Sequence, residues 1–189
     1  TYDNARLNKR NNLWWETSMT SSGNVTSLIY AAFGEGLDKK NKKLLNSPYA
    51  QFLKLTSEVR TLYKISEKQH IAARLMGGVI WAYGNQTIAP YSEQFYIGGA
   101  NSLRAFTVRS LGPGTYHPGK NTQYGYLDQT GDIKLEANIE YRFPIFGDLY
   151  GATFLDAGNV WLMREEESRP GGELTMKNFA KSIALGTGA

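Results

Sequence analysis

Hydrophobic and polar positions alternate with a period of two along most of this chain. The clearest case is the segment 131–144 (GDIKLEANIEYRFP). Its apolar positions are Ile133, Leu135, Ala137, Ile139, Tyr141 and Phe143, and its polar positions are Asp132, Lys134, Glu136, Asn138, Glu140 and Arg142. Because successive side chains of a strand point to opposite faces, the segment predicts a strand with one apolar and one charged face. We expect it to end at Pro144, which cannot donate a ladder hydrogen bond.

The same alternation recurs with less regularity elsewhere. Further single strands are expected at 52–66, at 71–84, at 149–161 and from about Phe179 onward. The segment 11–34 predicts two strands joined by a tight turn at Gly23 and Asn24. The pattern therefore predicts about seven strands and an all-β protein.

Connections of two lengths separate these segments. Three are tight (SSGN, SEKQ and PIFGD), whereas 35–48, 85–130 and 164–178 are long and polar. Short turns at one end, long loops at the other and strands of roughly 10–15 residues are typical of an antiparallel transmembrane β-barrel of the outer membrane. Aromatic residues near the strand ends fit its interfacial girdles; they are Trp14, Trp15, Tyr30, Phe33, Trp81, Tyr83, Tyr150 and Trp161. A soluble antiparallel β-sandwich is the alternative, although its strands are usually shorter.

The composition of the chain limits the kinds of site that we expect in the protein. The 189 residues contain no cysteine and two histidines, and the net charge is +4. Without cysteine there are no disulfides or thiolate ligands, and the isolated His70 and His117 have no ligand spacing, so we expect neither a metal nor a cofactor. The sequence shows no motif of a catalytic nucleophile, so we do not expect an enzyme. The basic residues are dispersed over alternating faces, which argues against nucleic acid as a partner.

Seven strands are fewer than the eight of the smallest bacterial barrels, and an open sheet would leave unpaired backbone groups in hydrocarbon. We therefore expect residues 1–189 to be one partial barrel domain whose remaining strands, and any periplasmic domains, lie outside this sequence. The run Lys39, Lys40, Lys42 and Lys43 is either a lipopolysaccharide contact or a solvated loop. The segment EEESRPGG (165–172) is expected to be a disordered loop tip.

One long connection carries an unusual motif, GGANSLRAF (98–106). It resembles the loop 6 motif of the BamA/TamA superfamily (the bacterial surface antigen family), in which a glycine pair precedes valine-arginine-glycine and an aromatic residue. Gly98, Gly99, Arg104 and Phe106 match, while Leu103 and Ala105 replace the valine and the glycine. NIEYRFP and ATFLDAGNVW resemble the two strands that follow loop 6 in that family, in the same order. The two departures favour a TamA-like branch.

The resemblance implies a 16-stranded barrel in which loop 6 (residues 85–130) folds into the lumen. Carried over to this sequence, it pairs Arg104 with Glu140 and Asp156 on the inner wall. Both acids occupy suitable positions, because Glu140 lies on the charged face of its segment and Asp156 interrupts the next one. The alternative is that the two carboxylates only line a wet lumen.

The implied function is non-enzymatic: part of an insertase or translocase that assists the assembly or secretion of outer-membrane proteins in a Gram-negative bacterium. The implied partners are client outer-membrane proteins, outer-membrane lipids, lipopolysaccharide, the remaining strands of the barrel, and periplasmic or lipoprotein subunits. Two alternatives stay open at this point. One is a porin or specific transporter with 85–130 as its constriction loop, and the other is the soluble β-sandwich as a binding module.

Overall fold

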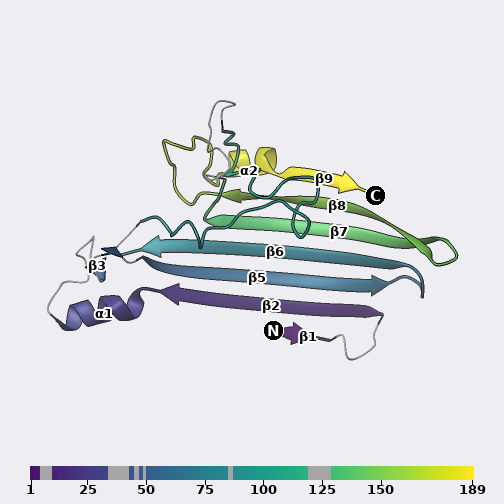
Figure 1. Cartoon of the computed structure of the whole chain (residues 1–189), viewed down its shortest axis with the longest axis horizontal. Helices are drawn as coiled ribbons and strands as arrows, with labels where there is room; N and C mark the ends of the chain where they lie inside the picture. The colour runs from purple at the N-terminus through teal and green to yellow at the C-terminus, as the bar shows by residue number, and fades with distance from the viewer. Residues whose placement is uncertain (5–9, 34–42, 45–46, 49, 85–86, 119–128) are drawn as a thin grey trace.

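One open sheet of seven antiparallel strands dominates the computed structural model of the chain (Figure 1). The structure describes residues 1–4, 10–33, 43–44, 47–48, 50–84, 87–118 and 129–189. In spatial order the strands are β1 (Tyr2–Asp3), β2 (Asn11–Ser22), β5 (Gln51–Lys64), β6 (His70–Tyr83), β7 (Ile133–Phe146), β8 (Leu149–Trp161) and β9 (Ala184–Gly188). β3 (Lys43–Leu44) and β4 (Ser47–Pro48) form a separate small pair. The predicted all-β class and antiparallel sheet are confirmed.

The two faces of the sheet differ as the alternation predicts. One face presents large apolar side chains to the exterior, namely Trp15, Met19, Leu55, Leu75, Trp81, Ile139, Leu155 and Leu185. The opposite face carries the charged positions of β5, β6 and β7, and we call it the inner face. An apolar exterior and a charged interior are the pattern of a barrel wall that meets lipid outside and water inside.

Loop 6 covers part of the inner face. Phe95, Ile97 and Leu103 of the loop are buried in one cluster with sheet residues that include Phe52 and Ile80. The described part of the loop lies over β7 and β8 in Figure 1. The small core of this chain is therefore the junction between loop and wall, and it fixes the loop to the inner face as the resemblance implies.

The prediction of a second strand within 11–34 was wrong. Ser22 ends β2, Gly23 follows with a positive φ of 77°, and Asn24–Ala32 forms the helix α1. β5, which comes later in the chain, pairs with β2 along its whole length from Asn11 to Ser22, and it takes the place that a hairpin partner directly after Gly23 would have had. The seventh strand of the sheet is instead the short β1.

The chain near the C-terminal strand also differs from the prediction. Phe179 lies in the helix α2 (Met176–Ser182), which the hydroxyl of Thr175 caps by accepting from the amide of Asn178. The strand begins only at Ala184. An N-cap hydroxyl satisfies a first-turn amide that an extended chain would pair elsewhere. No helix among the described residues is long and apolar enough to cross a membrane.

Three local predictions need correction. Trp14 faces inward, where the guanidinium of Arg60 lies 4.7 Å from its ring centroid, and Trp161 is only 1% exposed, so neither belongs to an exterior girdle. Pro144 does not end β7, because a register shift accommodates it and the strand continues to Phe146. Segment 165–172 is ordered around a buried Arg169.

Candidate functional site: the seat of loop 6 on the inner wall

A tight turn brings the loop motif to the wall. Gly98 and Gly99 have positive φ values of 100° and 93°. A Cβ atom on Gly98 would lie 2.2 Å from the carbonyl oxygen of Thr107, so this close approach of two backbones requires glycine. The amide of Gly99 donates to the carbonyl of Phe106 at 2.8 Å, which closes the motif into a compact hairpin-like turn. Leu103, fully buried, points into the core cluster and places its neighbour Arg104 against the wall.

The guanidinium of Arg104 forms a two-pronged contact with Asp156 of β8. Its Nε donates to Oδ2 at 2.9 Å and its Nη2 donates to Oδ1 at 2.8 Å. The backbone amide of Arg104 also donates to Oδ2, at 3.0 Å. The carboxylate of Asp156 is 0% exposed, so it depends on these donors in place of water. The structure thus brings Arg104 and Asp156 together.

Two further side chains complete the seat of this arginine. Nη1 of Arg104 donates to Oε2 of Glu140 on β7. The guanidinium also lies 3.7 Å from the ring centroid of Phe154, two residues before Asp156 on the same face of β8. We call Arg104, Glu140 and Asp156 the Arg104 clamp. An ion pair of this kind, flanked by an aromatic face, combines charge-assisted hydrogen bonds with a cation–π contact.

The strength of the clamp depends on its burial. Removing one partner of a buried ion pair costs about 3–5 kcal/mol. The side chain of Arg104 keeps 26% exposure and that of Glu140 keeps 19%, so water screens part of the clamp. We therefore place the cost of losing Arg104 at the lower end, about 3 kcal/mol.

The neighbouring strand leaves room for the loop. Gly186 of β9 pairs with Asp156, and a Cβ atom on it would lie 2.8 Å from Cβ of Ala105. Ala105 therefore packs against a position of the wall without a side chain. This explains how alanine takes the place of the family's glycine at this position of the motif.

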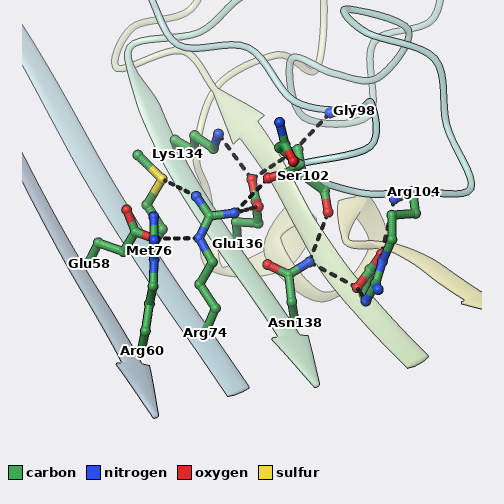
Figure 2. A network of polar contacts seen from close by, with 12 residues as sticks. Glu58, Arg60, Arg74, Met76, Gly98, Ser102, Arg104, Lys134, Glu136 and Asn138 are labelled. Carbon is green, nitrogen blue, oxygen red and sulfur yellow. Dashed lines mark hydrogen bonds and ion pairs between the residues drawn. The ribbon is translucent and has the colours of Figure 1, made fainter. Parts of the chain in front are cut away.

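Sequence reasoning missed a second set of contacts, which Figure 2 shows together with Arg104. The fully buried Glu136 of β7 accepts from Nη1 of Arg74 at 2.7 Å and from the hydroxyl of Ser102 at 2.7 Å. Nζ of Lys134 lies 3.0 Å from the same carboxylate. We call Arg74, Ser102, Lys134 and Glu136 the Glu136 cluster. Its only signal in the sequence was the place of Glu136 on the charged face of 131–144.

The other residues of the loop and of the basic run differ in what they contact. Phe106 of the motif packs at the edge of the core cluster. Arg109 has a positive φ of 60° and donates to the hydroxyl of Tyr91 at 2.9 Å, so it ties the loop to itself and not to the wall. Lys39, Lys40 and Lys42 lie outside the described residues. The site as a whole holds a loop against a wall by charge and packing.

Comparison with known proteins agrees with this architecture. The sequence profile of the Omp85 superfamily domain matches residues 19–189. The chain is also similar to the outer membrane protein assembly factor BamA of Neisseria meningitidis serogroup B, with 34% identity over 90 residues. That match covers 44% of this chain and 11% of the meningococcal protein. The aligned region is thus a small part of that relative.

Proposed function

We propose a function that proceeds from one premise: the chain belongs to the Omp85 superfamily. Its sheet is part of a β-barrel in the outer membrane of a Gram-negative bacterium. The proposed activity is that of an insertase or translocase, which assists the assembly or secretion of other outer-membrane proteins without covalent chemistry. The relative from Neisseria, named as an assembly factor, supports this activity.

The observation that carries the proposal is the Arg104 clamp. It joins the loop to β7 and β8 through Glu140 and Asp156, so the middle of this wall is braced from inside. An insertase needs a weakly paired seam at which an incoming strand can add to an exposed edge. A braced wall elsewhere keeps the barrel intact while that seam opens. The seam itself, between the first and last strands of the complete barrel, is part of the proposal and lies outside these strands.

The domain assignment follows from the open sheet. Unpaired strand edges are costly in hydrocarbon, so we infer that residues 1–189 form one partial domain and that further strands of a 16-stranded barrel pair with its two edges. Client outer-membrane proteins, lipids, lipopolysaccharide, and periplasmic or lipoprotein subunits are the proposed partners. Leu103 and Ala105 depart from the valine and glycine of the family motif and support a TamA-like branch, whereas the similar Neisseria protein is a BamA.

The test uses the full-length protein reconstituted in liposomes. Arg104→Ala is expected to lower the rate at which a β-barrel client is assembled and to expose the loop to protease. Arg142→Ala is the matched control, because Arg142 also pairs with Glu140 but is 54% exposed, and this pair lies within β7. Unchanged assembly by a variant whose loop is demonstrably released would overturn the proposal. Large steady conductance with no effect on assembly would support the porin alternative.

A further inference from the structure

We propose that the Glu136 cluster is a second attachment of loop 6, which positions the glycine-containing half of the motif independently of the Arg104 clamp. This inference rests on the proposed function only for its consequence in assembly. In structural terms, we infer that Ser102, Arg74 and Glu136 hold residues 98–102 in position. In Figure 2, Ser102 and Gly98 lie above Glu136, whereas Arg104 lies apart, beyond Asn138.

The hydroxyl of Ser102 joins the turn to the wall through a single oxygen. It accepts from the amide of Gly98 at 3.1 Å and donates to Oε2 of Glu136 at 2.7 Å. The amide of Ser102 donates to the carbonyl of Gly99 at 3.0 Å. The turn that contains both glycines is therefore closed by Ser102 and attached by it. A methyl group in place of this hydroxyl would break both links at once.

Arg74 of β6 provides a second link. Nη1 of Arg74 donates to the backbone carbonyl of Asn101 at 2.7 Å as well as to Glu136. Its Nε donates to Glu58 of β5 at 2.5 Å, which fixes the guanidinium from the other side. Glu58 in turn pairs with Arg60 at 2.5 Å. Charges of alternating sign thus cross β7, β6 and β5, and the buried carboxylate of Glu136 is paired with two cations, Arg74 and Lys134.

The clamp and the cluster touch through one residue. Nδ2 of Asn138 donates to the carbonyl of Ser102 at 2.9 Å and to Oδ1 of Asp156 at 2.9 Å. No charged side chain among those described belongs to both sets of ion pairs. Loss of the Ser102 hydroxyl leaves every ion pair of both sets in place, so it loosens the glycine half of the loop without removing a charge.

The test measures the position of each half of the loop separately in the full-length protein. This chain has no cysteine, so spin labels are attached at Lys68→Cys in the β5–β6 turn and at one loop position. Ala100→Cys reports the glycine half and Val108→Cys reports the half beyond Arg104. Both loop positions are exposed. Ser110→Ala is the matched control, because its hydroxyl donates to the carbonyl of Thr107 within the loop.

Ser102→Ala is expected to at least double the width of the distance distribution at position 100 and to leave position 108 within the parent range. Arg104→Ala is expected to do the reverse. Ser102→Thr, which keeps the hydroxyl, and Ser110→Ala should both keep the parent widths. The inference is overturned if Ser102→Ala broadens neither position, or if it broadens both equally. Broadening at position 100 with normal assembly would leave this inference standing and count against the proposed function.

Discussion

Arg104 and Asp156 face each other across the loop–wall junction with three hydrogen bonds, two from the guanidinium and one from the backbone amide of the same residue. The backbone bond matters because it fixes the carboxylate at the place where the two-pronged side-chain contact needs it. A lysine at this position would keep the charge but lose the fork and the aromatic stacking.

This geometry predicts a strong energetic coupling. In a double-mutant cycle with Arg104→Lys and Asp156→Asn, we expect a coupling of about 2–3 kcal/mol in the free energy of unfolding. The corresponding cycle for Arg142 and Glu140, an exposed pair at 2.7 Å, should give less than about 1 kcal/mol. Urea titration of the full-length protein in detergent micelles supplies the measurement. Equal coupling in the two cycles would contradict the assignment.

A second prediction concerns the packing of Ala105 against Gly186. Gly186→Ala places a methyl group 2.8 Å from Cβ of Ala105 and should destabilise the seated loop by about 1–3 kcal/mol. Gly77→Ala is the matched control, because its nearest neighbour, the carbonyl oxygen of Lys134, is 3.9 Å away. Limited proteolysis of the loop separates the two variants. Equal protease resistance would show that the wall yields at Gly186.

A third prediction concerns the packing of α2 on β8. Nε1 of Trp161 donates to the hydroxyl of Ser182 at 2.8 Å, and its ring stacks on Phe179 with centroids 5.5 Å apart. Trp161→Leu removes both contacts and should cost about 2–4 kcal/mol, whereas Ser182→Ala should cost about 1 kcal/mol. Hydrogen exchange of the α2 amides reads out the difference. Similar exchange rates in both variants would exclude a role for the ring.

A fourth prediction is a pH dependence at the ordered segment 164–174. Partial burial raises the pKa of Glu166, but hydrogen bonds from Ser168 and Arg169 and attraction to Arg169 lower it more, so that the pKa of this carboxyl lies below its usual range. A depressed carboxyl pKa stabilises the fold above the unfolded value and loses that contribution as pH falls through the folded value. Protease resistance of this segment should therefore fall below about pH 4.

Glu166→Gln should remove this dependence and lower resistance at neutral pH. Glu165→Gln is its control, because it changes the same charge at the neighbouring position. If the parent protein and Glu166→Gln follow the same pH profile, the pairing with Arg169 does not hold the segment.

The sequence predicts the faces of the strands well, because alternation is a local property. Glu140 and Asp156 could be assigned to the inner face from their positions along the chain alone. The contacts between strands are different, since they depend on register. Met76 of β6 lies opposite Glu136 of β7. No local pattern in the sequence predicts this register, because the long loop separates the two strands. For this reason the Glu136 cluster could not be predicted, although each of its members was visible as a polar residue.

The helices show a second limit on what the sequence can predict. The residues of α1 are apolar enough to suit a strand, and whether they form one depends on which segment pairs with β2. β5, which comes later in the chain, pairs with β2 along its whole length. Trp161 shows the same limit on a smaller scale. An aromatic residue at a strand end fits a lipid interface equally well until α2, the next element along the chain, covers it.

The donors and acceptors that receive the loop come from β6, β7 and β8, and this has a consequence for the order of folding. The receiving surface exists only when these strands are paired in one register. A slip of one residue in β7 would turn Glu136 and Glu140 toward the exterior, away from Arg74 and Arg104. The loop can therefore seat only on a correctly assembled wall, and its seating serves as a check that the strands have found their proper neighbours.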